Sequence, residues 1–145
     1  VGPAGGIVFH ITVGGLHGME AAPVDQGTAE WGCYLAPIEG ADGEGIGTGA
    51  QNTADIVVGC ADANTAAKIA DAYTLNGYND WFLPSRHELN MLYQQKNVVG
   101  GFWEEWYWSS SEEDTFYAWA QSFVDGTPND HHKDVIQRVR AVRAF

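Results

Sequence analysis

The sequence predicts an α+β fold, and three observations support this class. Short helical patterns lie in the first half of the chain, the second half is rich in β patterns, and glycine-rich turns separate the segments. The 145 residues include 18 glycines and six each of Trp, Tyr and Phe, and 45% of the chain is hydrophobic. This composition is typical of one globular domain with many turns and a core rich in aromatic rings.

The first half contains one predicted strand and two predicted helices. Residues 7–13 are mostly β-branched or aromatic and predict a strand that ends at a Gly-Gly turn. Residues 36–50 are rich in glycine and acid and predict a loop. A short helix follows, which begins at Asn52 or Thr53 and extends through residue 58, and the alanine pattern of residues 65–73 predicts a second one.

The third predicted helix has the clearest local signals. Ser85 stands three residues before Glu88, which is the spacing of a capping box. Leu89, Leu92 and Tyr93 then form an apolar stripe on one helix face. We therefore expect a helix that begins at Ser85.

Three strands are predicted in the second half, over residues 106–110, 115–123 and 135–145. Aromatic and β-branched residues are frequent in them, as in most strands. The Gly-Thr-Pro-Asn segment at residues 126–129 predicts a turn between the last two strands.

The net charge of −12 is unevenly distributed. Residues 1–67 contain no Lys or Arg, whereas the segment from His131 onward carries Lys133, Arg138, Arg140 and Arg143. Nucleic-acid binding is not expected, because it requires a basic domain, but the basic end is compatible with a local anion site. Membrane insertion is not expected either, because no apolar run reaches the roughly 20 residues of a membrane helix.

The two cysteines, Cys33 and Cys60, lack the spacing of a zinc site. They are either free buried thiols or partners in a disulfide. We expect the disulfide, which in the chain-entropy treatment of loop closure would stabilise the fold by about 3.5 kcal/mol.

No catalytic residue is predicted, and the chain is not expected to be an enzyme. His87-Glu88 resembles the start of a zinc-protease motif, but Met91 occupies the position of the second histidine. The serines at residues 109–111 lack the glycines of a nucleophile elbow.

No metal site and no cofactor is predicted. His131 and His132 are adjacent, so on a strand they would face opposite sides and could not bind one metal together. Calcium stays open as an alternative, because carboxylates cluster in the second half. These are Glu112, Glu113, Asp114, Asp125 and Asp130.

The first residues, Val-Gly-Pro-Ala-Gly, are compatible with the last triplet of a collagen-like Gly-X-Y stem or with an ordinary linker. The predicted organisation is therefore residues 1–5 as the end of a stem or linker, and residues 6–145 as a globular C-terminal ligand-binding domain.

An ordered series of motifs runs through most of the chain and resembles the C-terminal domain family named for the Legionella collagen-like protein. The resemblance implies a C-type-lectin-like fold, in which two or three short helices pack on a twisted antiparallel sheet with long loops. The motifs are Gly-Gly-Ile-Val-Phe at 5–9, Glu-Trp-Gly-Cys at 30–33, Gly-Tyr-Asn-Asp-Trp-Phe-Leu-Pro-Ser at 77–85, Glu-Leu at 88–89, Tyr-Trp-Ser-Ser-Ser-Glu at 107–112, Tyr-Ala-Trp at 117–119 and Val-Arg-Ala-Val-Arg at 139–143.

The resemblance also implies a function. It is that of a secreted adhesin on the bacterial cell surface, which binds sulfated glycosaminoglycans of the heparin or chondroitin-sulfate type and promotes attachment and biofilm formation. A collagen-like stem implies a homotrimer, because three chains wind together in a collagen helix. The Asn79-Asp80-Trp81 segment is only a permutation of a calcium-lectin motif, so calcium-mediated sugar binding is not implied.

Several residues of the motifs are expected to be structural. Trp81, Trp108 and Trp119 are expected in the core, and Arg140 and Arg143 are expected to form ion pairs with Asp80 or Glu88. The candidates for binding sulfate are then the other cationic side chains of the chain and two histidines: Lys68, Arg86, Lys96, Lys133, Arg138, His131 and His132.

Two other functions stay open. One is a lectin-like module that binds neutral glycans or proteins, with or without calcium, through loop aromatics such as Trp103 and Trp106. The other is an oxidase similar to the enzymes that activate sulfatases, which share this broad fold and depend on cysteines. A disulfide between Cys33 and Cys60 would leave no thiol for that chemistry.

Overall fold

The computed structural model covers residues 1–145 and confirms the α+β class, with eight strands in two sheets and four short helices. The smaller sheet has the order β1-β2-β8 and the larger one the order β3-β7-β4-β5-β6. All strand pairs are antiparallel except β4 and β7. The elements are β1 (Ile7–Ile11), β2 (Gly18–Ala21), β3 (Gly27–Ala29), α1 (Gly49–Gly59), α2 (Ala66–Asp71), α3 (Arg86–Gln94), α4 (Lys96–Val99), β4 (Trp106–Glu112), β5 (Tyr117–Ser122), β6 (Pro128–His132), β7 (Gln137–Val139) and β8 (Val142–Ala144).

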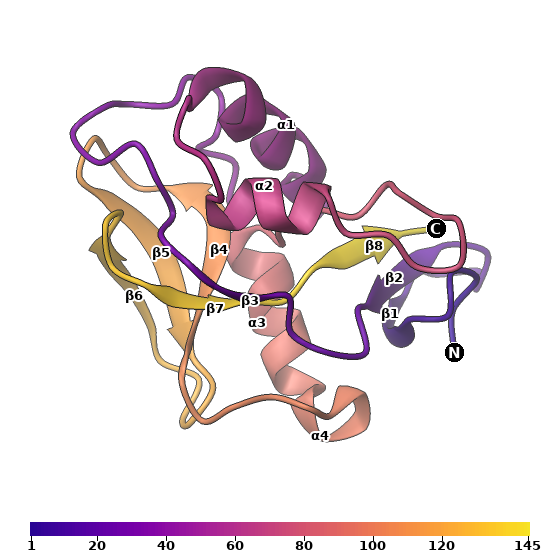
Figure 1. Cartoon of the computed structure of the whole chain (residues 1–145). Coiled ribbons are helices and arrows are strands. Elements are labelled where there is room, and N and C mark those ends of the chain that lie inside the picture. Colours follow the sequence, from indigo (N-terminus) through magenta and orange to yellow (C-terminus); the bar gives the residue numbers. More distant parts are fainter.

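The two sheets lie at opposite ends of the molecule (Figure 1). The smaller sheet lies at the end where both chain termini are found, and β6 forms the outer edge of the larger sheet at the other end. No helix is long and apolar enough to cross a bilayer.

Two hydrophobic clusters hold the layers together. The first contains Trp31, Trp81 and Trp108, and it packs with buried alanines of α2 and Ile56 of α1. The second joins α3 to both sheets and includes Phe9, Phe82, Leu89, Leu92, Tyr107 and Phe123. Each fully buried side chain of this size contributes about 1.5–3 kcal/mol by leaving water.

The third helix begins as the sequence predicts. Ser85 Oγ accepts a hydrogen bond from the Glu88 N–H at 3.3 Å, and Glu88 Oε1 accepts one from the Ser85 N–H at 2.8 Å. Glu88 Oε2 also accepts from the N–H of Gly47. Gly49 must be glycine, because a Cβ there would lie 2.2 Å from Glu88 Oε1. Glu88 therefore joins the starts of α1 and α3.

The predicted strand over residues 135–145 is wrong, because the chain changes sheets in its middle. Arg140 and Ala141 separate β7 from β8. The Ala141 C=O accepts from the Ala22 N–H, and the Ala141 N–H donates to Gln26 Oε1. These bonds take the place of a continuous strand ladder.

Strands β2, β3 and β6 and the single turn of α4 are not predicted from the sequence. Residues 128–132 begin with Pro-Asn-Asp, three residue types that are depleted in strands, and the sequence predicts a turn at residues 126–129. They form β6 because each pairs with a residue of β5, from Gln121↔Pro128 to Tyr117↔His132.

The folded domain extends into residues 1–5. Ala4 is fully buried, its N–H donates to Glu20 Oε1, and the Gly6 N–H donates to Glu20 Oε2. The boundary predicted at residue 6 is therefore too late, because Ala4 belongs to the core.

Candidate functional site

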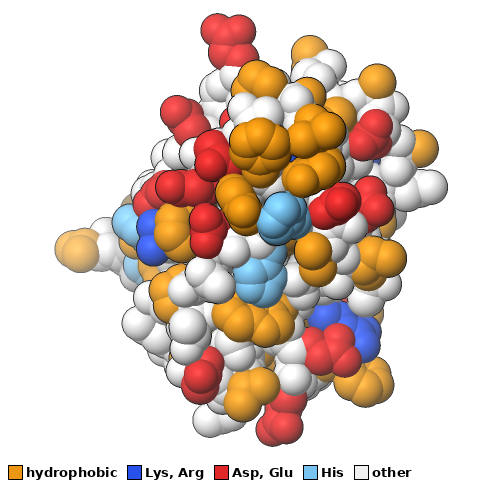
Figure 2. Space-filling model, turned by 90° about the vertical axis from the view of Figure 1, so that its left-hand side faces the viewer, with side chains coloured by type: hydrophobic (Ala, Val, Ile, Leu, Met, Phe, Trp, Pro, Cys, Tyr) orange, Lys and Arg blue, Asp and Glu red, His pale blue; other side chains and the backbone are white.

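Four aromatic rings lie together beside the β6 edge, and we call this group the aromatic–histidine surface. It consists of Tyr34, Phe116, Tyr117 and His132. The His132 ring lies 4.5 Å from that of Tyr117 and 5.6 Å from that of Tyr34, whose ring is 6.1 Å from that of Phe116. Tyr34 and Phe116 keep 37% and 43% of their surface exposed. Figure 2 shows this side of the molecule, with histidines near the centre, hydrophobic side chains beside them and acidic ones around them.

A constrained turn presents Tyr34. Its neighbours Cys33 and Leu35 both have positive φ, +48° and +73°, a region that non-glycine residues seldom adopt. The Cys33–Cys60 disulfide confirms the sequence prediction. The Cys33 N–H donates to Asp62 Oδ2, so the turn is attached to the segment after α1 by two links.

Lys133 holds the other end of this turn, and its predicted role is wrong. The side chain is fully buried, where Nζ donates to the Ala36 C=O at 3.0 Å and to Glu112 Oε2 at 2.8 Å. It also lies 4.9 Å from the centre of the Trp31 ring. A buried lysine with these partners cannot contact a sulfate at the surface, so Lys133 supports the site without touching the ligand.

Asp114 shapes the turn that carries Phe116. Its carboxylate accepts hydrogen bonds from the N–H groups of Phe116 at 2.7 Å and Tyr117 at 2.9 Å. The Lys133 N–H donates to the Phe116 C=O and continues the pairing of β5 with β6. The rings of the aromatic–histidine surface therefore sit on a hydrogen-bonded frame.

The two histidines face opposite sides of β6, as predicted for adjacent residues on a strand. His132 is exposed in the aromatic–histidine surface. His131 packs 4.4 Å from the Trp106 ring, and its Nδ1 is 2.6 Å from the Gln137 amide nitrogen. Burial lowers the pKa of His131, although Asp130 nearby opposes this shift. His131 therefore becomes charged at a lower pH than an exposed histidine does.

Arg86 and Arg138 form ion pairs that stay accessible. Arg86 pairs with Glu44 at 3.0 Å and lies over the Trp119 ring. Arg138 pairs with Glu105 at 2.6 Å, and this guanidinium lowers the pKa of the Glu105 carboxyl. The arginine side chains keep 29% and 19% exposure, respectively.

The seven predicted sulfate contacts do not gather on one surface. Lys68 lies on α2, where Nζ donates to the Asp62 C=O, and Lys96 begins α4 and donates to the Phe123 C=O. These helices lie on different sides of the large sheet (Figure 1). Of the predicted set, His132 belongs to the aromatic–histidine surface, and Arg86 lies over Trp119, which is two residues after Tyr117 on β5.

The structural ion pairs expected for Arg140 and Arg143 are confirmed, and one of them, Arg143 with Asp80, has a predicted partner. Arg143 pairs with Asp80, as expected, and also with Glu20. Arg140 pairs with Asp25 at 2.6 Å, and its other nitrogens donate to the carbonyls of Ala22, Gly100 and Gly101. Glu88 pairs with neither arginine and is bound by backbone N–H groups.

Two of the three tryptophans expected in the core are fully buried, Trp81 and Trp108. Trp119 is half-buried under Arg86. Among the loop aromatics, Trp103 keeps 57% exposure beside Arg138, whereas Trp106 packs on the first core cluster.

Four of the five carboxylates considered for calcium, all except Asp130, already have protein partners. Glu112 pairs with Lys133, Glu113 accepts from the Trp119 indole, and Asp114 and Asp125 accept from backbone N–H groups. Thr127 holds the pKa of Asp125 below its usual value. Cys33, Cys60 and Asp62 also lie close together, but the two sulfurs are bonded to each other.

The sequence motifs that form β4, β5, β7 and β8 lie in a part of the chain that matches a known protein family. The family described as the Lcl C-terminal domain matches residues 26–143. The chain belongs to this family. No curated protein matches the sequence of this Lcl domain.

The sequence does not predict that Tyr34, Phe116 and Tyr117 belong to one surface. Tyr34 comes from the loop before α1, whereas Phe116 ends the β4–β5 turn and Tyr117 begins β5. Only the fold brings these segments together. A weak signal exists in the sequence, because each aromatic lies beside turn or cysteine residues where a loop presents side chains outward.

Proposed function

We propose that this Lcl domain is the non-enzymatic ligand-binding head of a secreted bacterial surface adhesin, and that it binds glycans through the aromatic–histidine surface. The observation that carries this proposal is the group of four rings, in which Tyr34, Phe116 and His132 are exposed and Tyr117 is half-buried. Monomeric proteins seldom expose contiguous apolar groups with a polar rim unless the group binds something. Tyr34 and the β4–β5 turn are both held by several hydrogen bonds, so little order has to be gained on binding.

Sulfated glycans are the first candidate ligands, of the heparin or chondroitin-sulfate type. Exposed ion pairs contribute only about 0–1 kcal/mol, so a sulfate can replace Glu44 on Arg86 or Glu105 on Arg138 at little cost. Hydrogen bonds from a guanidinium to a sulfate are charge-assisted. Family membership supports an adhesin-type domain, and attachment and biofilm formation are the biological roles we propose for it.

Neutral glycans are the second candidate, and the charge distribution favours them. The salt bridges involve six of the 19 carboxylates, so 13 have no cationic partner (19 − 6 = 13). A net charge of −12 repels a polyanion at long range. A neutral sugar would stack on the rings and direct its hydroxyls to nearby carboxylates such as Asp114.

We also propose a homotrimer as the working form. In a collagen-like protein three chains wind together, so three identical heads are displayed at one end. A long glycan that contacts three heads gains affinity through effective concentration, even where each single contact is weak.

The buried serines support a role in binding without catalysis. Ser109 Oγ donates to the Trp119 C=O, and Ser111 Oγ donates to the Gly43 C=O. Ser110 Oγ accepts from the Asn52 amide. Hydroxyls held in this way tie strand β4 to its neighbours.

The test compares two tyrosines of equal exposure. Tyr34 and Tyr78 are each 37% exposed, but Tyr78 lies over Arg143, outside the aromatic–histidine surface. We expect Tyr34→Ala and Phe116→Ala to weaken glycan binding at least tenfold, and Tyr78→Ala to change it less than twofold, measured on heparin and on desulfated heparin. Equal affinities for all three variants and the parent domain would contradict the proposal.

A further inference from the structure

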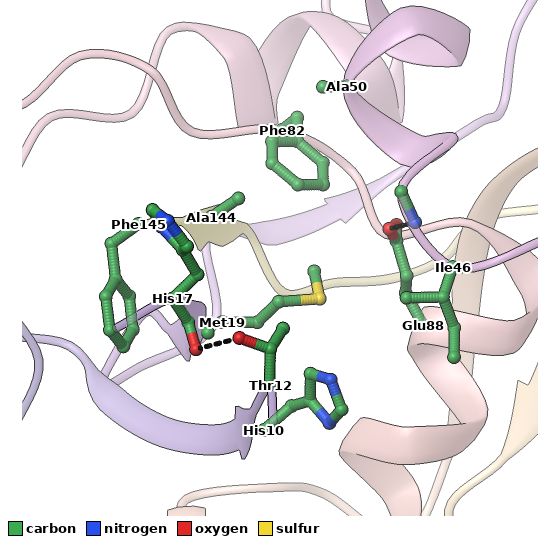
Figure 3. Close-up of a pocket in the computed structure, with 12 residues that line it drawn as sticks. His10, Thr12, His17, Met19, Ile46, Ala50, Phe82, Glu88, Ala144 and Phe145 are labelled. Atoms are coloured by element: carbon green, nitrogen blue, oxygen red, sulfur yellow. Dashed lines mark hydrogen bonds between the residues drawn. The ribbon is translucent and has the colours of Figure 1, made fainter. Parts of the chain in front are cut away.

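A separate cavity opens at the opposite end of the molecule, beside the smaller sheet. Its volume is about 470 Å³, within the range of small-molecule sites. Its walls come from β1, β2, the loop before α1, the start of α3 and the end of β8. Figure 3 shows Phe82 and His10 on opposite sides of this space, with Ile46 and Glu88 to one side and Phe145 to the other.

The lining of the cavity is mainly apolar. Met19 and Phe82 are buried at 5% and 6% exposure and form its floor, while Ile46 at its mouth is 57% exposed. The neighbouring hairpin adds Leu16, which is 81% exposed. Exposed apolar side chains around an apolar hollow extend the surface that a ligand can cover.

The few polar groups of the cavity lie at defined positions. Glu88 is fully buried, and its carboxylate accepts from the N–H groups of Ser85 and Gly47. Burial raises the pKa of this carboxyl. His10 and His17 line the same space with imidazole nitrogens that can donate or accept hydrogen bonds. No Lys or Arg lines the cavity.

These features select against charged ligands. An anion would meet the Glu88 carboxylate and a protein of net charge −12, with no cation to receive it. A cation would have to leave water for a mainly apolar lining, with only a carboxylate already bound by two N–H groups as its partner. An uncharged molecule meets neither cost.

We propose that this cavity is a second binding site, for small uncharged molecules with an aromatic or branched apolar body and one hydrogen-bonding group. The apolar body lies against Met19 and Phe82, and the polar group meets His10 or His17 at the mouth. The cavity shares no lining residue with the aromatic–histidine surface, and the smaller sheet beside the cavity lies at the end of the fold opposite β6 (Figure 1).

Indole is a suitable probe, because it is flat, uncharged and has one N–H donor. We expect saturable amide shift changes at residues 10–19, 46–50 and 82 in a ¹H–¹⁵N titration. Indole-3-carboxylate has the same ring with a negative charge, and it should bind at least tenfold more weakly.

Matched alanines of α1 provide the control. Ala50 lines the cavity, and Ala54 lies one turn further along the same exposed face. Ala50→Phe should raise the dissociation constant of indole at least tenfold, and Ala54→Phe should change it less than twofold. Ala144→Phe fills the cavity from β8, outside α1, and should cause the same loss, so the test does not depend on whether Ala50→Phe disturbs the helix. The proposal is overturned if indole causes no saturable shifts, if its carboxylate binds equally well, or if the cavity-filling variants bind indole like Ala54→Phe.

Discussion

Lys133, Arg140 and Arg143 lie in the interior and Arg86 and Arg138 lie at the surface, yet all five pair with carboxylates. The buried pairs join distant segments, such as Arg140 to Asp25 across 115 residues. Removing one partner of a buried pair costs about 3–5 kcal/mol, whereas an exposed pair is worth about 0–1 kcal/mol. Burial therefore decides whether a cation holds the fold or is free to exchange its partner for a ligand.

The largest expected effect comes from Arg140→Met. This change leaves Asp25 without its cation and removes the donors of three main-chain carbonyls. We expect a loss of about 3–5 kcal/mol in the free energy of unfolding, measured by urea denaturation. Arg138→Met is the matched surface control, with an expected loss below about 1 kcal/mol. Similar losses of unfolding free energy in both variants would contradict the distinction between buried and exposed ion pairs.

The next effect concerns the disulfide, which lies between the core and the aromatic–histidine surface. Replacing Cys33 and Cys60 with serine should lower the free energy of unfolding by about 3.5 kcal/mol in the chain-entropy treatment. It should also weaken glycan binding, because the turn that presents Tyr34 loses a link. Mass spectrometry provides a direct check, since two thiols that react with an alkylating agent without reductant would contradict the bond.

A third prediction concerns binding more than stability. Changing both Arg86 and Arg138 to Gln should cost less than about 2 kcal/mol in stability, because both ion pairs are exposed. If sulfated glycans are the ligands, the double variant should bind heparin at least fivefold more weakly in a filter or plate assay. Unchanged heparin binding would favour the neutral-glycan alternative.

The smallest effect is a pH dependence from His131. Burial lowers its pKa in the folded state, so the unfolded chain takes up the proton first. Stability from this group is therefore present above the unfolded pKa of about 6.5 and is lost as the pH falls below it. The loss of stability between pH 7 and 5 should be smaller in His131→Gln than in the parent domain. An identical loss of stability between pH 7 and 5 in both proteins would show that His131 does not contribute to the pH dependence.

Local signals in the sequence predict some elements well. The third helix is correct because Ser85 and Glu88 form a capping box that needs no distant partner. The disulfide is also correct. By contrast, β6 depends on pairing with β5, and the break between β7 and β8 depends on the contacts of Arg140 with loops far away in the chain. No local pattern contains this information.

The candidate site is harder to predict for the same reason. Lysine is seldom fully buried, so Lys133 is a natural surface candidate until Glu112 and the Ala36 carbonyl are placed beside it. Tyr34 and Phe116 are 82 positions apart (116 − 34 = 82) and meet only in the folded chain. Burial and proximity, which decide the roles of these residues, come from the tertiary structure.

The most direct test maps the ligand contact residue by residue. A ¹H–¹⁵N titration with a heparin hexasaccharide should shift the amides of residues 33–36, 114–119 and 130–132, together with the Nε–H of Arg86. The side-chain Nε–H of the buried Arg140 should stay unchanged, and the shifts should diminish with added salt. Shifts centred on Arg140 and Arg143, or the absence of shifts at the aromatic–histidine surface, would contradict the account.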